Sequence, residues 1–237
     1  MGRPEPPPGE PSLFGVIDDV INDVKKAPVR FFSVGLPAFC VTLFMEFVLV
    51  AGIAALVMTS RETGSTLLAL AAAFVGVVTF LVWTFVQLPL EAGVIRHLWQ
   101  TLHDDSVAYS PKAPLQLGFR KVLRPLSVWV LMASMVSVGL VLGVVPGLLL
   151  AASLTFALPA ALVDDMGPFA AVKASLAHAK AHPGWHLRLA LMLLACGFAA
   201  SSVPFLGQLM GPPFITMVLL RAYVGAQESE LPSPSAE

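Results

Sequence analysis

Residues 163–190 hold the side chains that come closest to a catalytic or metal-binding pattern. Two aspartates, two lysines and three histidines lie here between two long apolar stretches. The histidines are His178, His182 and His186, which recur every four residues. This spacing can place metal ligands on one face of a helix. Pro183-Gly184 interrupts such a helix after His182, and no cysteine or glutamate stands nearby to complete a zinc site. We therefore predict no metal and no other cofactor.

A helical wheel gives these histidines a plainer role. Phe169, Val172 and Leu176 form an apolar stripe, with Lys173 and Lys180 inside or beside it, while Ser175 and the first two histidines point the other way. Lysines at the edge of such a stripe bury their stems and reach lipid phosphates. We expect this helix to lie on the inner membrane surface, with its histidines facing water or neighbouring cytoplasmic loops.

Asp164 and Asp165 are the second candidate for chemistry. Paired carboxylates can do acid–base work, but adjacent ones on a helix or turn point in different directions. Capping of a helix over 168–182, with Pro168 in its first turn, is the plainer interpretation. We predict the capping role.

Glu46 is the third candidate, because it lies near the middle of a long apolar run. An ionised side chain at the centre of a bilayer costs about 2.5–3.5 kcal/mol, so Glu46 should face the helix bundle or a cavity. Two roles remain open. Glu46 is a proton or substrate site in a carrier, or it forms a hydrogen bond between helices.

The other signatures of catalysis are missing from the sequence. It has no GxSxG, no HExxH, no phosphate-binding or dinucleotide fingerprint, and no aspartate inside an apolar run. We therefore expect a protein that is not an enzyme.

The amino-acid composition indicates what kind of protein carries these residues. Of the 237 residues, 57% are hydrophobic and 12% charged, and the mean hydropathy is +0.81. Soluble domains carry about 25% charged residues, so lipid must surround much of this chain. The net charge of −1 argues against a nucleic-acid partner. Cys40 and Cys196 fall in apolar runs and resemble buried small hydrophobes more than a disulfide or metal pair.

Apolar runs of about 20 residues predict an all-α bundle of about six transmembrane helices. We place the crossings at about 36–58, 65–90, 126–145, 147–163, 187–204 and 206–223. Pro146-Gly147 is the predicted turn of the second hairpin. The run 189–223 is long for one crossing and short for two, with a break at Gly211-Pro212-Pro213. One membrane domain then covers residues 12–226, between a disordered leader, 1–11, and a disordered tail, 227–237.

The basic residues predict the orientation. With six crossings, all of the 14 Lys and Arg except Arg61 fall on one side, which puts both termini in the cytoplasm. Three basic stretches each combine an amphipathic surface helix, a lysine and a proline ahead of a crossing. Their candidate contacts with lipid headgroups are Lys25, Lys26, Arg30, Arg120, Lys121, Arg124, Lys173, Lys180 and Arg188.

One long segment resembles a bacterial inner-membrane family. In "VVPGLLLAASLTFALPAALVDDMGPFAAVKASLAHAKAHPGW" the matching positions are Pro146-Gly147, Pro159, Asp164-Asp165, Gly167, Ala170-Ala171, Ser175 and Trp185. The family includes the membrane domain joined to some glycerophosphodiester phosphodiesterases and many stand-alone proteins. The resemblance covers roughly residues 120–225 and implies topology and the bacterial inner membrane. It does not imply hydrolysis, because the catalytic barrel is missing from this sequence.

The sequence is compatible with two functions. A non-catalytic inner-membrane protein would organise partner proteins, further copies of itself or anionic phospholipids through its basic surface helices. The alternative is a secondary transporter, or a transport accessory, that uses Glu46.

Overall fold

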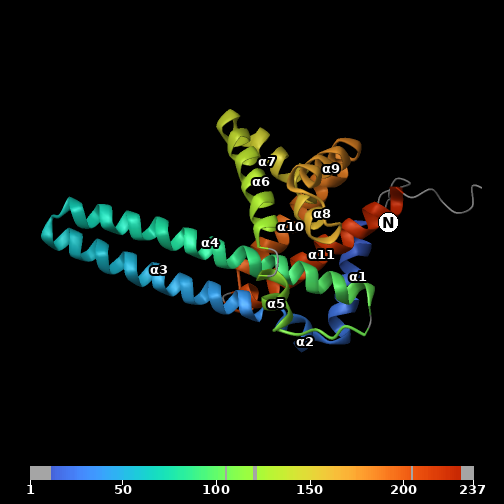
Figure 1. Cartoon of the computed structure of the whole chain (residues 1–237), viewed down its shortest axis with the longest axis horizontal. Helices are drawn as coiled ribbons and strands as arrows, with labels where there is room; N and C mark the ends of the chain where they lie inside the picture. Colours follow the sequence, from blue (N-terminus) through green and yellow to red (C-terminus); the bar gives the residue numbers. More distant parts are fainter. Residues whose placement is uncertain (1–11, 105, 120–121, 204, 231–237) are drawn as a thin grey trace, which may run out of the picture.

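The chain folds into helices throughout the residues that the structure, a computed structural model, describes: 12–104, 106–119, 122–203 and 205–230. Figure 1 shows their arrangement. They are α1 (Leu13–Lys26), α2 (Pro28–Ser33), α3 (Leu36–Thr63), α4 (Thr66–His103), α5 (Ala113–Phe119), α6 (Leu123–Leu142), α7 (Val144–Ser153), α8 (Ala157–Val163), α9 (Pro168–Ala181), α10 (Pro183–Ser201) and α11 (Leu206–Glu230).

Six stretches of the described chain are long and apolar enough to cross a membrane, which confirms the predicted all-α multi-pass fold. They comprise α3, α4, α6, the pair α7–α8, α10 and most of α11. Residues 183–228 contain two such helices, where the sequence left the choice between one and two crossings open. Three times along the chain, short helices precede a pair of membrane-length stretches: α1 and α2 before α3 and α4, α5 before α6 and α7–α8, and α9 before α10 and α11.

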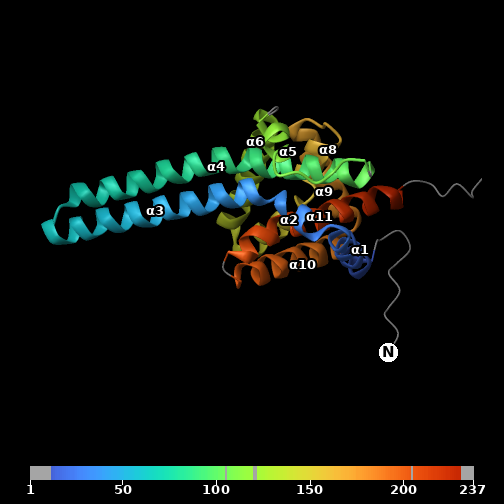
Figure 2. The ribbon, with the colours of Figure 1, turned by 90° about the horizontal axis from the view of Figure 1, so that it is seen from below.

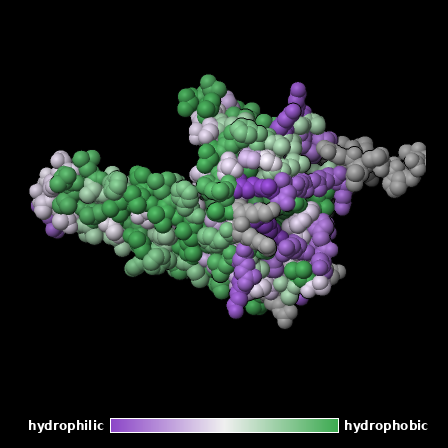
Figure 3. All heavy atoms as spheres, viewed as in Figure 1, coloured by the Kyte–Doolittle hydropathy of each residue, from purple (hydrophilic) through white to green (hydrophobic). Residues whose placement is uncertain are grey.

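The α3–α4 hairpin projects from the rest of the molecule, as Figures 1 and 2 both show. Most of its length is apolar on the face seen in Figure 3, and hydrophilic side chains gather at its tip and over the opposite end of the molecule. None of the most apolar window of α3 is buried within the chain. The hairpin therefore exposes the kind of surface that hydrocarbon, not water, solvates.

The packed core lies where the last part of α4 meets α6, α8 and α11. Leu98, Val128, Ala161 and Leu220 are all fully buried there. α4 reaches this core because it continues to His103, thirteen residues past the predicted end of the crossing at 90. The amphipathic surface helix expected in the second basic stretch, after the crossing at 65–90, therefore begins as the last part of α4, where Ile95 and Leu98 are buried.

Two copies of one short pattern hold α5 against α4. "PLEAG", residues 89–93, lies in α4, and "PLQLG", residues 114–118, lies in α5. A Cβ added to Gly93 would lie 2.0 Å from the carbonyl oxygen of Pro114, and one added to Gly118 would lie 1.9 Å from that of Pro89. Only glycine allows the two backbones to approach so closely. Arg96 adds a hydrogen bond of 2.9 Å from its guanidinium to the Leu117 carbonyl oxygen.

The second hairpin turns earlier than predicted. Its turn is at Gly143, whose φ of +147° suits glycine, and Pro146 lies in the first turn of α7. Proline is tolerated there because the first helical N–H groups have no acceptor inside the helix. The predicted crossing at 147–163 is also broken, because α7 ends at Ser153 and α8 begins at Ala157.

The ends of the predicted domain also need correction. α11 continues through residues 227–230, which were predicted to belong to a disordered tail. The predicted leader, 1–11, and residues 231–237 lie outside the described residues. At the other end, α1 has its Ser12 cap and packs on α11, with Val16, Val20 and Asp23 buried.

Candidate functional site

His186 is buried and does not face water, whereas His178 and His182 are half-buried. α9 ends at Ala181 and α10 begins at Pro183, so the chain bends and folds His186 back toward His178. Nδ1 of His178 lies 2.7 Å from Nε2 of His186, and the His186 side chain is buried. An N–H···N hydrogen bond needs one ring nitrogen to donate and the other to accept, so at least one of these rings is neutral.

Phe156 stands at the centre of an aromatic cluster that includes both of these histidines. The distances from its ring centroid are 5.4 Å to His178, 5.7 Å to Trp185, 4.9 Å to His186 and 5.2 Å to Tyr223, mostly with edge-to-face geometry. Such pairs stabilise a fold by about 0.5–1.5 kcal/mol beyond burial alone. The aromatic cluster joins the start of α8 to α9, α10 and α11.

The buried face of α9 includes Val172 of the predicted apolar stripe but not Phe169. Phe169 is 77% exposed, whereas Ala171, Val172, Ser175 and Ala179 are buried. Small side chains let α9 lie close to its neighbours, and this outweighs the burial of one large ring at the helix start.

Ser175 bridges the break between α7 and α8. Its hydroxyl donates to the Ser153 carbonyl oxygen at 2.7 Å and accepts from the Phe156 N–H at 3.2 Å. These are backbone groups that a continuous helix would have paired. Because the only hydroxyl proton is given to a carbonyl, Ser175 is not arranged as a nucleophile activated by the nearby His178.

A cavity of about 370 Å³ adjoins the aromatic cluster, lined in part by Met166, Ser175, His178, Tyr223 and Gln227. Its polar groups are engaged: the Tyr223 hydroxyl donates to Asp164, and so does Gln227 Nε2, at 2.9 Å. Among the residues that the structure describes, no three His, Cys, Asp or Glu side chains lie close enough together to hold a metal ion.

The aspartate pair does not cap α9, so that prediction is wrong. The N-cap position is Gly167, and no side chain caps it. Asp164 instead binds Tyr223 and Gln227 on α11. Asp165, in the left-handed conformation at φ +53°, forms an ion pair with Arg124 at the start of α6. Each carboxylate ties the loop before α9 to a different distant helix.

One further ion pair was not predicted from the sequence. Asp23 on α1 accepts a hydrogen bond from Arg221 Nε on α11 at 3.1 Å and another from Lys26 Nζ at 3.1 Å. The side chain of Asp23 is only 10% exposed. The one signal in the sequence was an aspartate at the edge of the apolar side of the first helix, since Asp23 lies next to Val16 on the wheel.

Glu46 lies on the exposed hairpin, away from the aromatic cluster. Its side chain lines a cavity of about 170 Å³ between α3 and α4, together with Thr79, Trp83 and three apolar residues. Trp83 Nε1 is buried, and no described group accepts its proton. Glu46 is itself exposed and lines a small, mostly apolar pocket formed by two helices.

The predicted lipid contacts are distributed over several elements. Lys25 and Lys26 are exposed at the end of α1, Lys173 and Lys180 on α9, and Arg188 on α10. Arg188 Nε also donates to the Gly184 carbonyl oxygen at 3.2 Å. Arg124 is held by Asp165. Arg30 belongs to α2, and Arg120 and Lys121 lie outside the described residues.

Comparison of the chain with protein-family models, with curated proteins and with solved structures finds no match in any of the three. The resemblance to the membrane domain of glycerophosphodiester phosphodiesterases stays a prediction from the quoted residues.

Proposed function

We propose that this chain is a non-catalytic, multi-pass protein of the bacterial inner membrane that binds anionic phospholipids through its basic surface helices and organises partner proteins there. Both termini lie in the cytoplasm in this proposal. The observation that supports it most is that buried and exposed polar side chains have different contacts. The polar side chains inside the fold bind one another, whereas the lysines of α1 and α9 point outward.

Three aspartates and Ser175 have structural partners. Asp23, Asp164 and Asp165 each bind a side chain of another helix, and Ser175 binds two backbone groups. A catalytic group must instead be free to reach a substrate. The contacts that the structure contains explain why these residues occur in an apolar protein without invoking a reaction.

The exposed lysines are suited to headgroups. Lys173 and Lys180 extend from α9, which directly precedes the apolar α10. A lysine near an anionic membrane surface contributes about 1 kcal/mol of attraction, and salt weakens it.

The test compares the lipids that remain with the protein after extraction of the membrane with a nanodisc-forming polymer. We expect enrichment of phosphatidylglycerol and cardiolipin over the bulk membrane, and a lower enrichment at high salt. The double variant Lys173→Gln/Lys180→Gln should reduce the enrichment. The matched control is Arg61→Gln, at the tip of the α3–α4 hairpin, which should not. A lipid composition equal to that of the bulk membrane would refute the proposal.

A carrier is the second candidate, because Glu46 shares its cavity with Thr79 and the unpartnered Trp83 indole. Proton carriers place carboxylates at this kind of depth. Glu46→Gln, reconstituted in vesicles, should abolish proton-coupled uptake if the protein is a carrier. Unchanged assembly and an unchanged cell phenotype would remove this candidate.

A further inference from the structure

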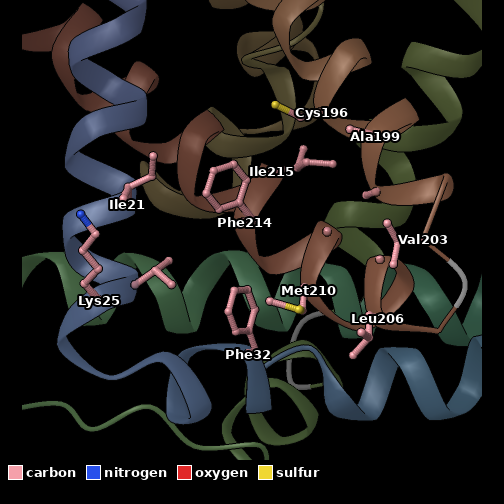
Figure 4. Close-up of a pocket in the computed structure, with 14 residues that line it drawn as sticks. Ile21, Lys25, Phe32, Cys196, Ala199, Val203, Leu206, Met210, Phe214 and Ile215 are labelled. Atoms are coloured by element: carbon pink, nitrogen blue, oxygen red, sulfur yellow. The ribbon is translucent and has the colours of Figure 1, made fainter.

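An apolar cavity of about 540 Å³ opens between α1, α2, α10 and α11 (Figure 4). Aliphatic and aromatic side chains from all four helices form its walls, among them Ile21, Phe32, Val203, Met210, Phe214 and Ile215. Its volume lies within the range of about 300–1,000 Å³ that is typical of small-molecule sites.

The base of this cavity is built from small residues. Ala200 of α10 faces Gly207 and Gly211 of α11, and all three line the cavity together with Ala199. A Cβ added to Gly207 would lie 1.6 Å from the Ala200 carbonyl oxygen. The two helix backbones are thus in contact at this point, and the space beside them is left open because no large side chain fills it.

One charged group stands at the edge of the cavity. Lys25 is the only ionisable side chain, apart from the Cys196 thiol, among the described residues that line it. Figure 4 shows its amine on α1, across the cavity from α10. Within the described part of the chain, this amine forms no hydrogen bond or ion pair, whereas the adjacent Lys26 binds Asp23. The cavity therefore has one cationic end, and the rest of its lining is almost wholly apolar.

We propose that this cavity holds one acyl chain of an anionic phospholipid, with the lipid phosphate on the Lys25 amine. The inference rests on the proposed function and gives it a defined site. A hydrocarbon chain matches the walls, and an anionic headgroup compensates the lysine charge. A transmembrane helix of another protein would cover the same walls but would supply no counter-charge to the Lys25 amine.

The arrangement of the cavity lining fits this occupant. Lys25 stands at one edge of the cavity, and apolar side chains of α10, α11 and their connection, among them Val203 and Leu206, line the rest. The acyl chain of a lipid whose phosphate contacts Lys25 would therefore lie along α10 and α11.

The headgroup part of the proposal is tested by native mass spectrometry of the purified full chain in detergent, titrated with phosphatidylglycerol and with phosphatidylcholine. We expect one phosphatidylglycerol to bind more tightly than phosphatidylcholine. Lys25→Gln should weaken phosphatidylglycerol about fivefold, the loss expected for one lysine–headgroup contact. The matched control Lys26→Gln, one residue away, should bind as the wild type does.

The cavity part is tested by filling it. Ala199→Phe places a ring in the cavity from α10, where the alanine is exposed and no core residue must move. Both lipids should then lose their single tight site. Ile21→Trp fills the cavity from α1 and serves as the independent second variant, and a thermal unfolding curve verifies that each variant is folded.

Tight binding that survives both filling variants would overturn this inference, and so would equal binding of the two lipids to the wild type. Loss of a stable oligomer, rather than of lipid, in the filled variants would show that a protein helix occupies the cavity, which also overturns it. Lys173→Gln/Lys180→Gln separates the two proposals. It should lower the general enrichment of anionic lipid and leave the single tight site intact.

Discussion

Asp23 and Arg221 lie 198 residues apart and form a pair that holds the first surface helix on the last membrane helix. A carboxylate that is only 10% exposed carries a large desolvation cost, and its partners offset that cost. Asp164 and Asp165, which are exposed, were expected to act locally as caps and instead bind α11 and α6. At each of these positions, the distant partner determines the role of the charge.

Arg221→Ala should therefore reduce the free energy of unfolding by about 2 kcal/mol, because the Asp23 carboxylate loses its main partner. Thermal unfolding in detergent measures the loss. The control Lys26→Gln should cost about 0.5 kcal/mol or less, since that side chain is 75% exposed. The exchanged pair Asp23→Arg/Arg221→Asp should recover part of the stability. An Arg221→Ala variant as stable as wild type would show that the ion pair does not hold α1.

The spacing of the histidines did not predict how they lie in the fold. The interruption by Pro183-Gly184 was visible in the sequence, and it does separate α9 from α10. The direction of the bend was not visible, because it depends on Phe156 and Tyr223, which come from other helices. The burial of His186 follows from that bend.

At the scale of the elements, hydrophobic length predicted the long helices well, because an apolar stretch must satisfy its own backbone hydrogen bonds in lipid. Their ends were less predictable. α4 continues past its apolar run because α5 packs on it through Gly93 and Gly118, a contact between segments that no local pattern reveals. The break between α7 and α8 likewise depends on the hydroxyl of Ser175, 19 residues beyond Phe156.

The crossing of α4 and α5 should be sensitive to a single methyl group. Gly93→Ala puts a Cβ about 2 Å from a backbone oxygen, so α5 must move away, and we expect a loss of about 2 kcal/mol or more in stability. Faster proteolysis of the connection at 106–112 should accompany it. The matched control is Gly52→Ala in α3, where no atom lies within 4 Å of the added carbon, and where alanine favours the helix. Equal stability of the two variants would contradict the packing described here.

For the whole molecule, composition was the most informative property of the sequence. A chain with 57% hydrophobic and 12% charged residues has more apolar surface than a water-soluble fold of this size buries, and the exposed α3–α4 hairpin is where that surplus is most visible (Figure 3). The apolar cavity beside Lys25 could not be predicted in the same way. Its walls come from helices that are some 170 residues apart, and its space depends on which small residues face one another.

In the proposed topology, six helices cross the bilayer and the basic connections lie on one side of it. The most direct test is labelling of single cysteines with a membrane-impermeant maleimide, after Cys40 and Cys196 are replaced by alanine. The three labelled positions are Arg61→Cys, Lys112→Cys and Lys173→Cys, each on an exposed residue. We predict labelling of Arg61→Cys in intact spheroplasts, and labelling of the other two only after the membrane is opened. Labelling of Lys112→Cys and Lys173→Cys from opposite sides of the membrane would contradict the account.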